Sequence, residues 1–178
     1  PLASRSSCSS KTDSAVISSI DIYDGKSKIE SHITTPEAVE LQMHLRNALD
    51  AGMEFAQMEI SSQALKYHRV DDMLFDVAVF LNISEDHISP IEHADFEDYL
   101  SSKMLMFAKA NTAVVNLDAD CIERVLEEAK AAGEVLTFST TKPEADFYAY
   151  NIRKEGEATI FNVRCSAFDE EFKLTMPG

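Results

Sequence analysis

The chain has 178 residues, a length typical of one domain, and 45% of them are apolar, which is enough to form a hydrophobic core. It carries 31 acidic and 16 basic residues, a net charge of -15. Such a charge repels phosphate backbones and anionic lipids, so we expect no nucleic-acid partner and no membrane partner. The three cysteines form no CxxC pair, and no apolar run approaches the roughly 20 residues of a membrane span. We therefore expect a cytoplasmic protein with reduced thiols.

The N-terminal third predicts a leader, a strand and a helix. Residues 1–14 are Ser-rich without periodicity and indicate a flexible leader, whereas residues 14–25 contain enough β-branched residues for one strand. Thr35 is expected to cap a helix with Pro36 at its first position and Gly52 just past its end. The apolar spacing predicts that one stripe of this helix is buried, formed by Ala38, Leu41, Leu45, Ala48 and Leu49.

Strands and helices then alternate along the chain. The expected strands cover residues 53–60, 75–83, 112–117 and 134–139. The expected helices cover 93–110 and 118–133, with Gly133 as the last terminator, and residues 61–70 are expected to form a short helix or a turn. The run 75–83 is almost continuously apolar, which is typical of a parallel strand covered on both faces. Alternation of this kind predicts βαβ units.

The pattern changes at about residue 145. Residues 145–178 alternate with period two around expected turns at 155–156 and 169–170, which indicates an antiparallel hairpin or meander. The predicted fold class is therefore α/β, with a mainly parallel sheet flanked by helices and an appended antiparallel hairpin or meander.

Polar residues follow three of the expected strands, where open α/β sheets bind ligands. Each group alone is explained by helix capping, but three groups on one rim indicate an anion or metal site. No Gly-rich phosphate loop of the type G-x-x-x-x-G-K-[ST] or G-x-G-x-x-G occurs in the sequence. The three groups contain Glu59, Ser61 and Ser62; Asn82, Ser84, Glu85, Asp86 and His87; and Asn116, Asp118 and Asp120.

Six ordered blocks carry a resemblance to a known family. They read TTPEAVELQ, MEISSQALKYHRV, FDVAVFLNISEDH, EDYLSSKMLMF, AVVNLDAD and LTMPG. In this order they resemble the central ATPase domain of Mur ligases, most closely those that add the third amino acid to UDP-N-acetylmuramoyl-dipeptide. The resemblance covers about residues 15–178. In the family a phosphate loop lies upstream of the TTP block and a further domain follows, so we expect a piece of a larger ligase, inactive alone and a monomer or weak oligomer.

The resemblance implies a reaction and its cofactors. Family members use ATP and Mg²⁺ to convert the dipeptide carboxylate to an acyl phosphate, which the amine of an amino acid then attacks. The expected partners are thus UDP-N-acetylmuramoyl-dipeptide, ATP and an amino acid whose identity this sequence leaves open.

The resemblance also implies site residues. The family's metal-binding and catalytic groups fall on Glu59, His87 and Lys103, the last being the lysine that relatives carboxylate with CO₂. A carbamate is an oxygen-donor anion, which suits a hard cation. Substrate contacts fall on Thr34, Thr35, Ser61 and Arg69, and Asn82, Asn116 and Asp118 are expected towards the nucleotide.

One further departure and two alternatives remain at this point. Residues 88–93 belong to a segment about two residues longer than in relatives, and His93 is an open candidate for a family histidine. The other histidines, His32, His44 and His68, are expected at the surface or as caps. The alternatives are a folylpolyglutamate- or cyanophycin-type ligase of the same superfamily, or a degenerate, non-catalytic Mur-like module.

Overall fold

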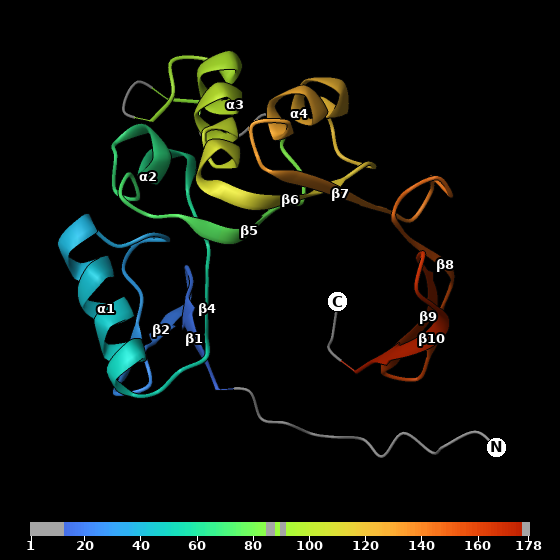
Figure 1. The fold of residues 1–178 in the computed structure, drawn as a ribbon, viewed down its shortest axis with the longest axis horizontal. Coiled ribbons are helices and arrows are strands. Elements are labelled where there is room, and N and C mark those ends of the chain that lie inside the picture. Colours follow the sequence, from blue (N-terminus) through green and yellow to red (C-terminus); the bar gives the residue numbers. More distant parts are fainter. Residues whose placement is uncertain (1–12, 85–87, 90–91, 176–178) are drawn as a thin grey trace. The chain divides into compact units, whose positions relative to one another are not determined.

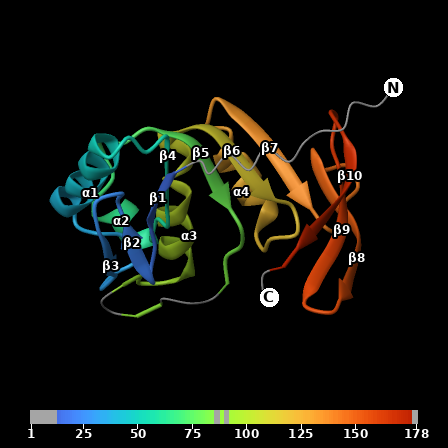
Figure 2. The same cartoon turned by 90° about the horizontal axis from the view of Figure 1, so that it is seen from below.

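The computed structural model describes residues 13–84, 88–89 and 92–175. The chain divides into two compact units, residues 1–71 (unit 1) and 72–178 (unit 2), each with its own sheet (Figures 1 and 2). In the part of the chain that is described, no helix is both long and apolar enough to cross a bilayer. The expected leader falls mostly outside the described residues.

Unit 1 contains a four-stranded sheet in the order β3-β2-β1-β4. β1 pairs antiparallel with β2 and parallel with β4. The prediction of one strand over 14–25 is therefore wrong, because the chain turns back at Ser18, whose hydroxyl donates to the carbonyl of Asp21 at 2.9 Å. The strands are β1 (Ser14–Ile17), β2 (Asp21–Tyr23), β3 (Lys28–Glu30) and β4 (Phe55–Met58).

Helix α1 (Ala38–Asp50) lies beside this sheet, and the short α2 (Ser62–Lys66) follows β4 (Figure 1). Glu37, not Thr35, is the N-cap residue of α1, so the predicted cap is wrong. Gly52 has a φ of +77° just past the helix, as expected for a C′ glycine. Of the predicted stripe, Leu41 and Ala48 are buried and Leu45 is half-buried, but Ala38 and Leu49 are exposed.

Unit 2 contains a six-stranded sheet in the order β10-β9-β8-β7-β6-β5. β5 to β8 are parallel, and β8, β9 and β10 are antiparallel. The predicted α/β class with an appended meander is confirmed. The second turn was placed too late, since the amide of Cys165 donates to Phe168 O at 2.9 Å and β10 already begins at Asp169. The strands are β5 (Phe75–Phe80), β6 (Ala110–Asn116), β7 (Glu134–Ser139), β8 (Phe147–Glu155), β9 (Ala158–Arg164) and β10 (Asp169–Leu174).

Helices α3 (Phe96–Met104) and α4 (Ile122–Ala129) lie on the same face of β5, β6 and β7 (Figure 1), and the 3-10 turn η1 (Phe107–Lys109) leads into β6. On β5, Ala78 and Phe80 are buried, whereas Val77 and Val79 are 53% and 49% exposed. The expectation of a strand covered on both faces is wrong for β5, because both helices of unit 2 flanking it pack on one side.

Gly133 does not terminate the helix that precedes it. α4 ends at Ala129 with Lys130 as its C-cap, and Gly133 lies outside the positive-φ region. A Cβ at Gly133 would lie 3.0 Å from the carbonyl oxygen of Asn111. The glycine is thus required by a close backbone approach at the start of β7.

Candidate functional site

In unit 1 the hydroxyl of Thr35 joins the segment before α1 to the end of β4. Thr35 is fully buried, and its Oγ1 donates to the carbonyl of Glu59 at 3.0 Å and accepts from the amide of Ser61 at 2.9 Å. Ser61 in turn caps α2, because its Oγ accepts from the amide of Ala64 at 3.1 Å. Thr35 is not a helix cap because its hydroxyl forms hydrogen bonds with the backbone of Glu59 and Ser61, which lie 24 and 26 residues further along the chain.

Arg69 belongs to the same cluster as Thr35 and Ser61. Its Nη1 donates to the carbonyl oxygen of Thr35 at 3.1 Å, and its Nη2 lies 2.6 Å from Oε1 of Glu37. Its Nε is buried without a hydrogen-bond partner among the described residues. Thr35, Ser61 and Arg69, which the resemblance implied as one set of substrate contacts, therefore lie together, and Thr34 precedes Thr35 directly.

Glu59 is exposed at the end of β4. Its Oε2 accepts from the amide of Ser19 at 2.8 Å, which ties the turn between β1 and β2 to the end of β4. A carboxylate has about four lone-pair sites, so this contact leaves Glu59 able to accept further hydrogen bonds or bind a cation.

In unit 2 the loops that follow β5, β6 and β7 are joined by side-chain hydrogen bonds. Asn116 donates through Nδ2 to Leu81 O at 2.9 Å, and Asn82 accepts through Oδ1 from the amide of Asp120 at 3.0 Å. Asn82 and Asn116 thus lie on the same rim of the sheet, at the carboxyl ends of neighbouring strands, as their sequence positions predicted. The prediction that three polar groups share one rim is wrong, because Glu59, Ser61 and Ser62 follow β4, which belongs to the sheet of unit 1.

Asp118 binds the loop after β7. Its carboxylate accepts from the hydroxyls of Ser139 and Thr141, each at 2.5 Å, and from the amide of Thr140 at 2.6 Å. Burial alone would raise the pKa of Asp118, but these hydrogen bonds outweigh it and hold the pKa well below its usual range. These three partners were not predicted from the sequence, although the run of Ser and Thr residues at the end of β7 could have indicated hydroxyl donors at this strand end.

Lys103 lies in the last turn of α3, and its Nζ donates to the hydroxyl of Tyr99 at 3.2 Å. Glu59 is in unit 1, Lys103 is in unit 2, and His87 lies outside the described residues, so the expected metal set stays a prediction. Over residues 13–84, 88–89 and 92–175, no three His, Cys, Asp or Glu side chains are placed to hold a metal ion. An ammonium has no lone pair, so the protonated form of Lys103 cannot bind a cation.

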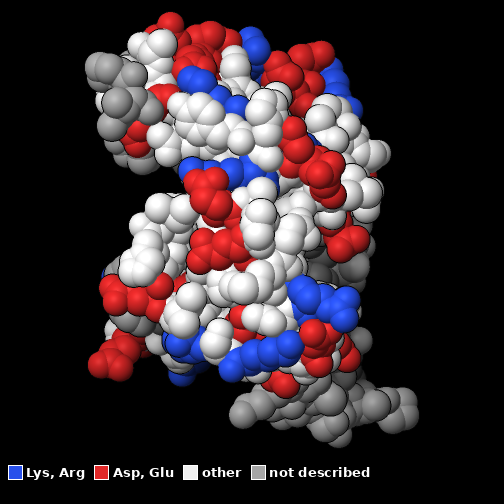
Figure 3. Space-filling model, turned by 90° about the vertical axis from the view of Figure 1, so that its left-hand side faces the viewer, with Lys and Arg blue, Asp and Glu red and all other residues white. Residues whose placement is uncertain are grey.

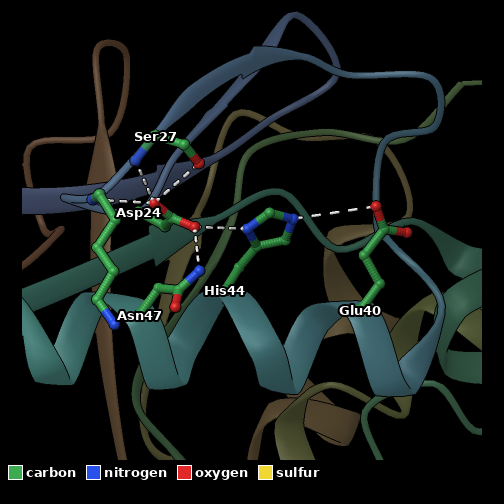
Figure 4. Close-up of polar contacts among 6 residues, drawn as sticks. Asp24, Ser27, Glu40, His44 and Asn47 are labelled. Atoms are coloured by element: carbon green, nitrogen blue, oxygen red, sulfur yellow. Dashed lines mark hydrogen bonds and ion pairs between the residues drawn. The ribbon is translucent and has the colours of Figure 1, made fainter.

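A buried network in unit 1 contradicts one prediction. His44, expected at the surface, is only 2% exposed, and its Nδ1 lies 2.8 Å from Oδ2 of Asp24 (Figure 4). Asn47 donates to the same oxygen at 2.8 Å, and the amide of Ser27 donates to Oδ1 at 2.7 Å. Burial alone would raise the pKa of Asp24, but hydrogen bonds from His44, Asn47 and two backbone amides hold it well below its usual range.

Charged side chains of both signs are interspersed on the surface. On the face drawn in Figure 3, Lys and Arg side chains form several small groups separated by acidic and uncharged side chains.

The fold and these residues define an α/β domain with polar side chains gathered at strand ends. Comparison with known proteins identifies its family: the model of the Mur ligase middle domain matches residues 5–178. The chain therefore belongs to the Mur ligase family.

Relatives and solved structures agree with this assignment. The chain is 47% identical over 127 residues to a UDP-N-acetylmuramyl-tripeptide synthetase of Bifidobacterium longum, covering 70% of this chain and 25% of that protein. It is 40% identical over 144 residues to a UDP-N-acetylmuramoyl-L-alanyl-D-glutamate–L-lysine ligase of Streptococcus agalactiae, covering 79% and 28%. A solved UDP-N-acetylmuramoyl-L-alanyl-D-glutamate–2,6-diaminopimelate ligase superposes with a TM-score of 0.78 at 25% identity, covering 92% and 34%. The chain thus spans a quarter to a third of these relatives.

Proposed function

We propose that this chain is the middle-domain portion of a cytoplasmic, ATP-dependent ligase of peptidoglycan precursor synthesis that joins an amino acid to UDP-N-acetylmuramoyl-dipeptide. The names of the relatives support the substrate, since two of those compared are ligases of UDP-N-acetylmuramoyl-L-alanyl-D-glutamate. The structural observation that carries the proposal is the cluster of Thr35, Ser61 and Arg69, in which residues far apart in sequence meet at one strand end.

In this proposal Thr34, Ser61 and Arg69 bind the anionic substrate. Thr35, predicted as a further contact, is fully buried and instead holds Ser61 and Arg69 in place. Arg69 supplies a local cation in a chain of net charge -15, and its contacts with Glu37 and the Thr35 carbonyl hold the guanidinium in one orientation. A planar guanidinium held in this way can present its remaining N–H groups to a carboxylate or phosphate.

The reaction proceeds in two steps. A carboxylate oxygen of the dipeptide attacks the γ-phosphorus of ATP, the bond from that phosphorus to the bridging oxygen breaks, and ADP leaves. The amine nitrogen of the amino acid then attacks the acyl carbon, phosphate leaves, and the nitrogen releases a proton. The protein contributes positioning and charge neutralisation. Asn82 and Asn116 are assigned to the nucleotide side, and Asp118 holds the loop beside them.

Lys103 is assigned a carbamate, with Glu59 and His87 as its partners at a cation. Its neutral amine forms the N–C bond with CO₂, a C=O electron pair moves onto oxygen, and the nitrogen releases a proton to water. Mg²⁺ held there would neutralise charge on the phosphate oxygens. The carboxylate, imidazole and carbamate offer oxygen and nitrogen donors, of which the oxygens suit Mg²⁺.

The test uses the full-length protein that contains this chain. It is incubated with ATP, Mg²⁺ and UDP-N-acetylmuramoyl-L-alanyl-D-glutamate, with L-lysine or diaminopimelate in separate arms, and products are identified by mass spectrometry. We expect ADP, phosphate and a UDP-linked tripeptide in equal amounts. Turnover with folate and glutamate alone would instead support a folylpolyglutamate-type ligase. Absence of Mg²⁺-nucleotide binding by calorimetry would support a non-catalytic module.

A further inference from the structure

Residues 88–89 and 92–93 belong to the segment that the family resemblance left unexplained. Among them, His93 lies in the interior, shortly before α3. Ile88 forms a bridge with His93, and the amide of Ser89 donates to the carbonyl of His93 at 3.1 Å. The hydroxyl of Ser89 also donates to Oε2 of Glu92 at 3.1 Å. His93 is 1% exposed, and its Nδ1 lies 3.3 Å from Oδ2 of Asp98 on α3.

The imidazole of His93 packs on the ring of Tyr99. Their ring centroids are 5.1 Å apart with an interplanar angle of 44°, and Phe96 contacts the same ring edge-on at 6.4 Å. Tyr99 is only 5% exposed. The phenol is therefore held by aromatic contacts from both the inserted segment and the first turn of α3.

Tyr99 in turn contacts Lys103 in two ways. The lysine Nζ donates to the phenol oxygen at 3.2 Å, and it lies 5.3 Å from the centroid of the ring. The two residues are four positions apart on α3, so their side chains share one face of the helix. A carbamylated lysine keeps one N–H, and that N–H can still donate to the phenol oxygen, so this contact suits the amine both before and after it reacts.

We propose that Tyr99 and His93 are positioning residues for Lys103: Tyr99 holds the amine nitrogen, and His93 holds Tyr99. The inference rests on the proposed function, since it assumes that Lys103 reacts with CO₂. It gives His93, in the segment that the family resemblance left unexplained, a role as support of the phenol ring. A flexible lysine loses rotamer freedom when it is fixed, and a preformed contact removes part of that cost before the carbamate forms.

The test measures carbamate and turnover separately in the full-length protein. Labelled bicarbonate is added, the carbamate carbon is observed by ¹³C NMR, and kcat and KM are measured at low and high bicarbonate. We expect Tyr99→Phe to lower carbamate occupancy and kcat about tenfold at low bicarbonate, the size of one lost hydrogen bond. The KM for the UDP substrate should not change, and high bicarbonate should restore much of kcat.

Two further variants separate positioning from folding. His93→Ala should reproduce the Tyr99→Phe defect, and His93→Phe, which keeps an aromatic ring beside Tyr99, should regain most of the activity. Tyr150→Phe is the matched control, because it also removes a tyrosine hydroxyl that makes a hydrogen bond, here to Asp169 at 2.7 Å, in the meander of unit 2. It should keep wild-type carbamate occupancy.

The outcomes distinguish this inference from the proposed function. A wild-type carbamate signal that Tyr99→Phe and His93→Ala leave unchanged would overturn the positioning roles and leave Lys103 as assigned. A wild-type protein without any carbamate signal would overturn the assignment of Lys103, and the positioning roles with it. If Tyr99→Phe does not fold, the comparison of His93→Ala with His93→Phe decides the question.

Discussion

The imidazole of His44 lies 2.8 Å from the carboxylate of Asp24, and both side chains are almost completely buried (Figure 4). This pair joins α1 to the turn between β2 and β3. Asn47, one turn further along α1, donates to the same carboxylate oxygen. The network therefore ties the middle and the second half of α1 to the turn between β2 and β3.

Asp24→Asn should lower the stability of unit 1. Breaking a buried, hydrogen-bonded charged network by changing one partner typically costs about 3 kcal/mol. We expect a lower urea midpoint by circular dichroism and faster hydrogen exchange of α1 amides. Asp50→Asn is the control, because Asp50 pairs with Lys26 and Arg46 at the surface and its loss should have little effect. Equal decreases in urea midpoint for the two substitutions would show that the buried network stabilises unit 1 no more than the surface ion pairs of Asp50 do.

The same network predicts a pH dependence. The pKa of Asp24 is lower in the folded chain than in the unfolded chain, so the unfolded state binds a proton first as the pH falls. The contribution of Asp24 to stability is therefore complete above its unfolded pKa of about 4 and decreases below that pH. The difference in urea midpoint between wild type and Asp24→Asn should be constant from pH 7 to about 5 and shrink towards pH 2.5. A difference in urea midpoint that grows as the pH falls would contradict a lowered pKa of Asp24 in the folded chain.

Asp118→Ala should loosen the loop after β7. The carboxylate accepts hydrogen bonds from Ser139, Thr140 and Thr141, so its removal leaves that loop without its main anchor. Hydrogen exchange of the Thr140 amide should be about tenfold faster, because local opening then requires fewer broken contacts. Asp120→Ala is the control, since the contact of Asp120 with Asn82 uses its backbone amide. Unchanged exchange at Thr140 would refute the anchoring role.

Arg69→Lys should weaken binding of the UDP substrate. Lysine keeps the charge but cannot reproduce the planar arrangement that joins Glu37 and the Thr35 carbonyl. We expect the KM for UDP-N-acetylmuramoyl-dipeptide to rise at least tenfold in the full-length protein, with little change in the KM for ATP. Arg46→Lys, on the exposed side of α1, should leave both constants unchanged. A KM increase confined to ATP would place Arg69 at the nucleotide instead.

Lys103→Ala should abolish ligation in the full-length protein, because the proposed carbamate cannot form. A small added carboxylate, such as acetate, should restore part of the activity by supplying an oxygen anion in the vacated space. Lys109→Ala, just past the same helix, is the control and should retain wild-type turnover. Wild-type turnover of Lys103→Ala would refute the catalytic assignment.

The sequence alone determined the fold class and most elements. Local periodicity reports which face of a helix or strand is apolar, and it placed α1, β7 and the antiparallel meander close to their observed bounds. The six ordered blocks also identified the family, and the positions of Thr35, Ser61 and Arg69 as one site followed from that resemblance. The joined loops carrying Asn82 and Asn116 followed from the rule that carboxyl ends of parallel strands share one rim.

Only the tertiary structure decided how individual polar groups are used. Thr35 looked like a helix cap, but its hydroxyl binds the backbone at Glu59 and Ser61, and His44 looked like a surface residue, but Asp24 holds it inside. The role proposed for His93 depends on the folded structure, in which its imidazole packs on the ring of Tyr99, next to Lys103. Hydrogen bonds between residues some 20 positions apart leave no periodic pattern in a sequence. Their partners are chosen by the folded backbone, which brings those residues within reach.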